Sequence, residues 1–464
     1  MDESNWAIFA GNRAQYWPYL AFFHTYINQH GIPAALEKFV FSTEANAPGV
    51  EMLARFNGGL IHPLIHVGYG AEFALNGIVA EGGSLPHSSP EPLTHSSHCA
   101  GLAMAIISDD DFKVLRPHHD DRSSQVGAVE RLAGLDLLTS SNSNDQGLNL
   151  FSICELIAQD ADIIAEVSSP RGRETLPSAL EHAVPLAIQR GYFDLWKLTS
   201  ADLRDSTAQE PGWMAKWEEL VWFCSALSMG ATVKPGQKMT HDFFLVHLNN
   251  AALFMPVLLP LLSERSRSDL LQLFFRICMT VWLGVGRPSF HIGATLMAST
   301  DNPRNPHTES AKAGEYGKEA ILQEPPAWYG LAAAASVHGD VHHVKAIRAL
   351  MFYDQHFAHR PAGFACVQTD LVKAQMEKRD ALKGKAITSV FEGLNKLDGT
   401  AFVRTAGQLM QSQGWKTPVK SSSLELDWYV RSSKSSCGGG ADRLFAMLTR
   451  SFDGFYPQKP SSQL

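Results

Sequence analysis

Apolar residues recur every three or four positions along most of the chain, the spacing that places them on one face of an α-helix. Alternation of apolar and polar residues, typical of half-buried strands, is nearly absent. We therefore expect a mainly α fold, a single large helical domain over residues 1–464, with a flexible loop at 420–440 and another loop at 200–211. The periodicity predicts helices over 14–30, 33–40, 60–82, 150–166, 176–191, 214–229, 241–263, 267–285, 327–353, 369–396 and 398–413.

One predicted helix carries two histidines in an apolar setting, within the segment GGLIHPLIHVGYG that begins at Gly58. His62 and His66 are four residues apart, so a helix would direct both imidazoles to the same side. Neutral imidazole is the commonest metal ligand, and two of them one turn apart form half a metal site. Two ordinary core or surface histidines would give the same spacing, so the pair gains meaning only from matching ligands elsewhere.

A third histidine interrupts the apolar run FFLVHLNNAALF. His247 stands in the middle of this predicted buried helix, and burying an imidazole costs free energy unless its nitrogens find partners. An apolar residue would pack better at this position. His247 is therefore a second candidate source of a metal ligand.

The segment 337–345 supplies further candidates. Val337, Val341 and Val344 form one line at helical spacing, and a line of polar residues, His338, His342 and Lys345, lies next to it. A lysine beside metal ligands is unusual, because an ammonium repels a cation. It is chemically consistent if the lysine is neutral or has reacted with carbon dioxide to form a carbamate, which burial promotes by lowering the lysine pKa.

Taken together, these segments resemble the questin oxidase family, fungal enzymes that oxidise polyketide anthraquinones. The matching blocks are GGLIHPLIHVGYGAEF from Gly58, HDFFLVHL from His241 and D-x-H-x-x-K-x-x-R-A-L from Asp340, and the opening RAQYWPYLAFF from Arg13 also fits. The blocks span nearly the whole chain in the family's order. They indicate one family member rather than a borrowed module.

The resemblance implies a metal site between buried helices, in which non-haem Fe(II) is held by His62, His66, His247, His342 and a carboxylated Lys345. His338 and His343 remain alternatives to His342 as the fourth imidazole. A carbamate on Lys345, formed from carbon dioxide, would offset part of the iron's charge and supply an oxygen ligand. The implied reaction inserts oxygen from dioxygen next to a ring carbonyl of an anthraquinone and opens the ring, with NADPH as a further candidate cofactor.

Neighbouring residues suggest supporting roles. Tyr69 follows His66 by three residues and could reach the substrate, although a structural aromatic role is also open. Asp340 and Glu72 could orient imidazole N–H groups or form ordinary ion pairs with Arg348 or Arg55. Arg348 could bind a phenolate of the substrate or serve in an ion pair. We treat Tyr69, Asp340 and Arg348 as candidate catalytic residues.

Composition and missing motifs narrow the class of enzyme. The net charge of −8 and the absence of a basic stripe disfavour nucleic acid as a partner. The six cysteines are scattered and form no C-x-x-C motif, which favours a reducing compartment. The sequence also has no signal-like N-terminus and no long apolar run, so we expect a cytoplasmic protein without a membrane span. The ending Ser462-Gln463-Leu464 is a poor match to a peroxisomal signal. No G-x-G-x-x-G motif opens a βαβ unit, which disfavours a flavin mechanism and leaves NADPH without a recognisable site.

Two other interpretations stay open from the residues. One is a metal-free, NADPH-dependent Baeyer–Villiger monooxygenase that uses the same histidines as acid and base. The other is a non-enzymatic helical protein that binds a pathway intermediate. The first predicts activity that survives chelation, and the second predicts that alanine at His247 changes stability without abolishing any turnover.

Overall fold

The structure is a computed structural model, and it confirms the mainly α fold. It describes residues 1–80, 101–116, 147–168, 176–204, 211–230, 243–306, 327–379, 382–387 and 389–415. The loop predicted at 420–440 lies outside these residues. In the described part of the chain, the strands are two short segments, β1 (Phe290–His291) and β2 (Phe391–Glu392), which pair in parallel with Phe290 opposite Phe391.

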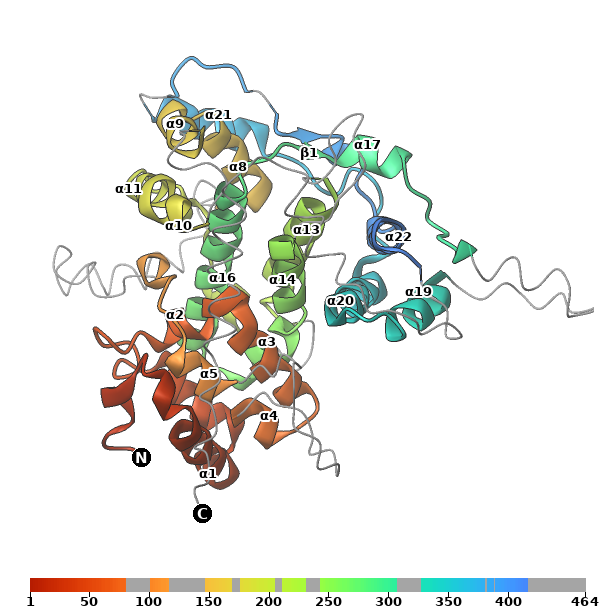
Figure 1. The fold of residues 1–464 in the computed structure, drawn as a ribbon. Coiled ribbons are helices and arrows are strands. Elements are labelled where there is room, and N and C mark those ends of the chain that lie inside the picture. The colour runs from red at the N-terminus through yellow and green to blue at the C-terminus, as the bar shows by residue number, and fades with distance from the viewer. Residues whose placement is uncertain are drawn as a thin grey trace, which may run out of the picture.

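The N-terminal third packs as a group of helices around the buried side of α1, at the lower left of Figure 1. The kink in α1 falls at Gly31 (φ 83°), close to Pro33, where the sequence predicted a break between two helices. The elements of this third are η1 (Trp6–Phe9), η2 (Arg13–Gln15), α1 (Tyr16–Leu36), η3 (Glu37–Phe41), α2 (Met52–Phe56), α3 (Gly58–Glu72), α4 (Asn76–Ala80), α5 (Leu102–Ile107) and η4 (Lys113–Leu115).

The middle of the molecule is built on α13 (Met214–Gly230), α14 (Phe243–Ala252) and α16 (Glu264–Gly284), which lie close together in Figure 1. Almost every residue of α13 from Leu220 onward is buried, as expected for a helix that is apolar on all sides and surrounded by others. Around them lie α8 (Leu150–Ala158), α9 (Ala161–Ser168), α10 (Leu176–Ser178), η5 (Ala179–Ala183), α11 (Val184–Gln189), η6 (Phe193–Leu195), α12 (Ser200–Leu203), α15 (Met255–Leu258) and η7 (Leu259–Leu261).

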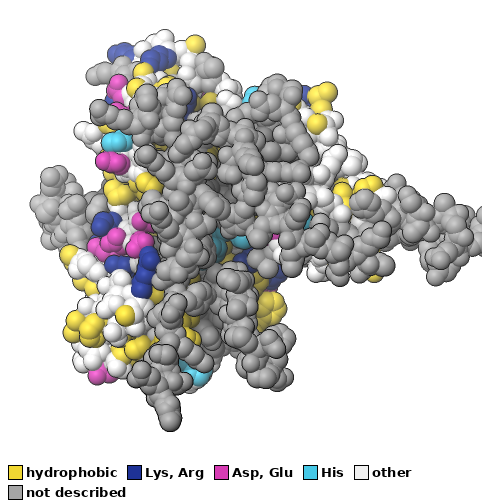
Figure 2. All heavy atoms as spheres, in the orientation of Figure 1, with side chains coloured by type: hydrophobic (Ala, Val, Ile, Leu, Met, Phe, Trp, Pro, Cys, Tyr) yellow, Lys and Arg dark blue, Asp and Glu magenta, His cyan; other side chains and the backbone are white. Residues whose placement is uncertain are grey.

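The C-terminal third adds α20 (Val341–Phe357), which packs on α14 and on α22 (Ala401–Gln413). The remaining elements of this third are α17 (Ile292–Met297), α19 (Ala327–Ser336), α21 (Thr369–Glu377) and η8 (Leu394–Lys396). On the face shown in Figure 2, acidic and basic side chains lie side by side at the left edge of the described surface. In the part of the chain that the structure describes, no helix is long and apolar enough to cross a bilayer.

Several predicted helices prove to be two. The predicted helix 60–82 divides into α3 and α4, because Ala74 takes a left-handed conformation (φ 53°) that ends α3. The predicted helix 327–353 divides into α19 and α20 at Val337–Asp340, so Val337 and Val344 do not form a buried line; their exposed fractions are 42% and 40%. The loop predicted at 200–211 begins with the short helix α12, which a capping box of Thr199 and Asp202 stabilises.

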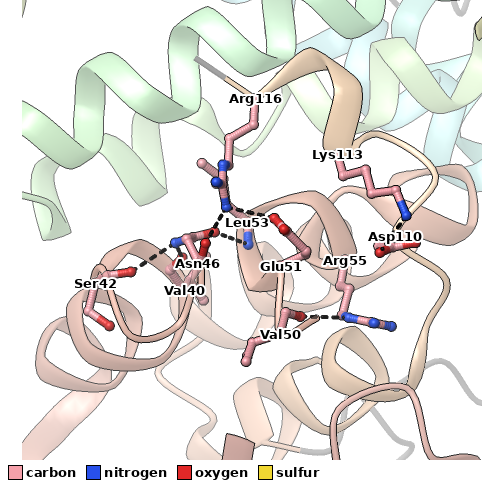
Figure 3. Close-up of polar contacts among 10 residues, drawn as sticks. All are labelled: Val40, Ser42, Asn46, Val50, Glu51, Leu53, Arg55, Asp110, Lys113 and Arg116. Carbon is pink, nitrogen blue, oxygen red and sulfur yellow. Dashed lines mark hydrogen bonds and ion pairs between the residues drawn. The ribbon is translucent and has the colours of Figure 1, made fainter. Parts of the chain in front are cut away.

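A set of hydrogen bonds fixes the chain immediately before α3 (Figure 3). The side chain of Asn46 accepts from the backbone N–H of Leu53 at 3.0 Å, and Arg116 bonds both the Asn46 carbonyl and the Glu51 carboxylate. Arg55 donates from Nε to the Val50 carbonyl at 2.7 Å. These bonds attach α2 to the loop that precedes it, so the start of α3 has a defined position.

Candidate metal centre

Three helices from distant parts of the chain, α3, α14 and α20, bring the predicted site residues together. His62 on α3 contacts His247 on α14, and His247 contacts His342 on α20, with ring centroids 4.9 Å and 5.4 Å apart. Further along all three helices, Tyr69 of α3 and Arg348 of α20 both lie against Phe254, directly after α14. The contacts therefore follow the same order along α3 and α14, and α20 lies against both helices through His342 and Arg348.

The first level of this arrangement is a cluster of three imidazoles. The Nε2 atoms of His62 and His247 are 3.1 Å apart. One ring nitrogen from each of His62, His247 and His342 can be chosen so that all three lie within 4.8 Å of one another. His62 and His247 are almost completely buried, whereas His342 is partly exposed.

The electrostatics of the cluster keep the imidazoles of α3 neutral. Burial, together with the neighbouring charges of His247 and Lys345, holds the pKa of His62 well below its usual range. Burial and the charge of Lys345 lower the pKa of His66 to about 3. A neutral imidazole offers a lone pair, which is the form that binds a metal or accepts a proton.

Asp340 fixes the orientation of His342. Its Oδ1 accepts the backbone N–H of His342 at 2.9 Å, as the N-cap of α20, and lies 2.7 Å from Nδ1 of the same residue. Because a carboxylate only accepts, Nδ1 carries the proton and Nε2 keeps its lone pair. Burial, the largest single effect, would raise the pKa of Asp340, but the hydrogen bonds from His342 and the charges of His342 and His343 together outweigh it and lower this pKa to about 2.

The other two histidines of this segment pair with each other. The rings of His338 and His343 stack with centroids 3.8 Å apart, and Nδ1 of His343 is 3.8 Å from Oδ2 of Asp340. Among the described residues, neither joins the three-histidine cluster. The structure thus places His342, rather than His338 or His343, against His247.

A left-handed turn sets the position of His62. Gly59, Leu60 and Ile61 have φ values of 52°, 59° and 64°, a conformation that costs about 1–2 kcal/mol for each residue with a side chain. Leu60 and Ile61 are buried, and this burial helps to hold the turn in place. Pro63 follows in the first right-handed turn, where its fixed φ is compatible with the helix and its missing N–H is not needed. From His62 onward, α3 is regular, and the rings of His62 and His66 lie on one side with centroids 6.1 Å apart.

Beyond the cluster lie two further levels. At the second, the charge of Lys345 acts on His66 across the interface between α3 and α20. At the third, the Arg348 guanidinium lies 5.0 Å from the Tyr69 ring centroid and bonds Glu72 at 2.5 Å. Burial raises the pKa of Tyr69, although Arg348 opposes this effect. Glu72, one of two candidates to orient an imidazole, therefore pairs with Arg348 instead.

Close packing between α3 and Phe254 depends on Gly68. A Cβ atom at Gly68 would lie 2.2 Å from the Phe254 ring. Only glycine lets the backbone of α3 approach this closely, and the same approach brings His62 to His247. Sequence reasoning did not assign a role to Gly68 or Phe254, although a glycine inside an apolar helix is a signal of close packing.

The donor set fits a divalent transition metal. Two imidazole nitrogens bound at right angles to one ion, at about 2.1 Å each, would be about 3.0 Å apart. The distance of 3.1 Å between the His62 and His247 nitrogens agrees with such a pair. Nε2 of His66 is buried and has no hydrogen-bond partner among the described residues, so this nitrogen is a further atom that could bind the metal.

Comparison with known proteins agrees with the motifs. The sequence profile of the questin oxidase-like family matches residues 1–350, which include all three histidine-bearing blocks. A Baeyer-Villiger oxidase of Paecilomyces divaricatus, AgnL3, is 27% identical over 53% of this chain and 44% of its own. Questin oxidases of Aspergillus terreus and Aspergillus fumigatus are 24% and 26% identical, over 73% and 59% of this chain and 62% and 52% of theirs. The chain thus matches about half the length of these relatives, and it belongs to the questin oxidase-like family.

Proposed function

We propose that this protein is an oxidoreductase that oxidises a hydroxyanthraquinone-type substrate at a non-haem iron. The observation that carries the proposal is the approach of His62, His247 and His342 to within 4.8 Å, with neutral, buried imidazoles on α3. Relatives named questin oxidase and Baeyer-Villiger oxidase support an oxidation of this kind. We infer that His66 and a carbamate on Lys345 complete the ligand set.

The iron, when bound, would supply the redox chemistry that lets dioxygen react with an organic substrate. The protein side chains have separate tasks. Asp340 holds the proton on Nδ1 of His342, so that Nε2 stays available. The carbamate on Lys345 would place one negative charge beside the imidazoles and lower the cost of burying a cation.

Oxygen insertion next to a ring carbonyl, followed by ring opening, is the reaction that we propose. In a monooxygenation one oxygen atom enters the substrate and the other leaves as water, so two electrons are required. NADPH is the proposed donor of these electrons. We propose that Arg348 and Tyr69, which contact each other at the third level, bind an ionised hydroxyl group of the ring.

A metal-free mechanism is the second candidate, and one observation favours it. At 3.1 Å, the two Nε2 atoms of His62 and His247 can share a proton in an N–H···N hydrogen bond, which is the arrangement of an acid–base pair. In this mechanism the same histidines would move protons while NADPH supplies electrons.

The metal content of anaerobically purified protein separates the two candidates. We expect near-stoichiometric iron in the wild type, its loss in His247→Ala and Lys345→Ala, and partial recovery of Lys345→Ala with acetate. His24→Ala, which removes an exposed histidine on α1, is the matched control and should keep its iron. Anthraquinone turnover that persists in chelator, with no bound metal, would replace the iron mechanism by the acid–base one.

A further inference from the structure

Two neighbouring asparagines on α14 have opposite hydrogen-bonding states. The Asn249 side chain accepts from Ser225 Oγ at 3.2 Å and donates to Ser228 Oγ at 2.5 Å. The Asn250 side chain is equally buried, with 2% of the residue exposed, but neither Nδ2 nor Oδ1 has a hydrogen-bond partner among the described residues. Asn249 is a structural amide, whereas Asn250 is unsatisfied.

An unsatisfied buried amide is unfavourable for folding. Removing an amide from water without replacing its hydrogen bonds costs free energy, and an apolar side chain of the same size would avoid this cost. The great majority of buried polar side-chain atoms in proteins have partners, so an exception calls for a ligand or a function.

Asn250 lies at the second level of the site, between the imidazole cluster and the contact of Tyr69 with Phe254. It follows His247 by three residues, about one turn along α14 and on the same side as His247 and Phe254. His66 is likewise about one turn beyond His62 on α3, and its Nε2 atom also lacks a hydrogen-bond partner in the described part of the chain. The contacts His62–His247 and Tyr69–Phe254 bracket both residues, so these two unsatisfied groups occupy the same level.

We propose that Asn250 is a substrate-positioning residue of this site, whose amide binds a neighbouring carbonyl and hydroxyl of the aromatic substrate. A primary amide presents one donor and one acceptor side by side. The complementary ligand therefore carries an acceptor next to a donor, as a hydroxyl beside a ring carbonyl does. Nδ2–H donates to the carbonyl oxygen, and Oδ1 accepts from the hydroxyl.

This inference deepens the proposed function and rests on it for the class of substrate. It adds a selectivity rule that the histidines alone do not give. An aromatic ketone with an adjacent hydroxyl should bind, and the same ring without the hydroxyl should leave Oδ1 unpaired in the complex. Such unpaired polar groups are the usual basis on which a polar site rejects an analogue.

The test measures stability and binding on metal-free protein, with Asn250→Leu compared with Asn249→Leu. The probe is danthron, an anthraquinone with hydroxyl groups beside a ring carbonyl, and binding is followed by quenching of tryptophan fluorescence. We expect Asn250→Leu to unfold at the same temperature as the wild type or higher, and to bind danthron about tenfold more weakly. Asn249→Leu should unfold at a lower temperature, because it removes the buried hydrogen bonds of this amide with Ser225 and Ser228.

The second probe is the parent anthraquinone, which has no hydroxyl group. Wild-type protein should prefer danthron, and Asn250→Leu should lose this preference. A melting temperature of Asn250→Leu that falls as far as that of Asn249→Leu, or an unchanged preference for danthron, would overturn the inference. Absence of iron and of turnover would overturn only the proposed function, since the melting temperatures and the binding of the two probes are measured without metal and without turnover.

Discussion

The Nε2 atoms of His62 and His247 are 3.1 Å apart, although the two residues are separated by 185 positions in the sequence. Two charged imidazolium rings would repel strongly at this distance, because both are removed from water. The arrangement is therefore compatible with a shared proton or a shared metal ion, but not with two protonated rings. This relationship makes the stability of the metal-free protein dependent on pH.

The first prediction concerns His66 in metal-free protein. Its folded pKa of about 3 lies below the ordinary value of 6.5, so the unfolded chain binds an extra proton as the pH falls below 6.5. The contribution of the neutral His66 imidazole to the free energy of unfolding is complete above pH 6.5. It is lost at about 1.4 kcal/mol per pH unit as the pH falls from 6.5 to the folded pKa. Urea unfolding of wild type and His66→Gln at neutral and acidic pH measures the difference. If wild type and His66→Gln lost the same amount of stability on acidification, the lowered pKa of His66 would be wrong.

Asp340→Asn separates the two tasks of Asp340. Asparagine is as good an N-cap as aspartate, so α20 should keep its stability to within about 0.5 kcal/mol. The amide lacks the charge that holds the proton on Nδ1 of His342, and metal affinity should fall about 10–100-fold. Isothermal titration with Fe(II) under anaerobic conditions gives the affinity. Asp340→Ala should lose the helix cap as well. If both variants bound Fe(II) with the affinity of the wild type, the hydrogen bond between Asp340 and His342 would be unimportant for the metal site.

Gly68→Ala tests the contact between α3 and Phe254. The added methyl would overlap the Phe254 ring, so α3 must move away from α14 at a cost of about 1–3 kcal/mol. The same movement separates His62 from His247, and metal binding should weaken. Gly330→Ala is the matched control, since a Cβ at Gly330 in α19 meets nothing within 4 Å. The melting temperatures of both variants test this expectation. An unchanged melting temperature of Gly68→Ala would show that Phe254 can move aside.

Ala74→Gly should stabilise the protein. Ala74 ends α3 with φ 53°, a left-handed conformation that glycine adopts without strain. The residue is exposed, so no packing is lost. We expect a gain of about 1 kcal/mol in the free energy of unfolding, measured in urea, with metal affinity unchanged. A loss of stability would mean that the flexibility of glycine in the unfolded chain outweighs the relief of strain.

Helix positions were predictable where the apolar period is strong. The helix predicted at 214–229 is α13, Met214–Gly230, and that at 267–285 is α16, Glu264–Gly284. Periodicity could not detect the break at Val337–Asp340, because alanine and valine continue the pattern through it. The capping signal was present, since Gly339 and Asp340 are typical residues at the boundary between two helices.

The sequence motifs identified the histidines that the structure brings together, but not their geometry. Residue order indicates that His62, His247 and His342 are unusual among apolar neighbours, and it contains nothing about the direction in which their helices run. The difference between Asn249 and Asn250 was equally out of reach. Both are amides in one apolar helix, and only the positions of Ser225 and Ser228 on α13 show which of them is satisfied.

The wide separation of α3, α14 and α20 along the sequence has a consequence for the order in which the protein is made. The three imidazoles of the cluster come from three distant segments, and helices that the chain forms between them, such as α13 and α16, build the centre of the molecule. During synthesis the cluster stays incomplete until α20 leaves the ribosome. The nascent chain therefore carries two buried histidines without their third partner until most of the protein has been translated.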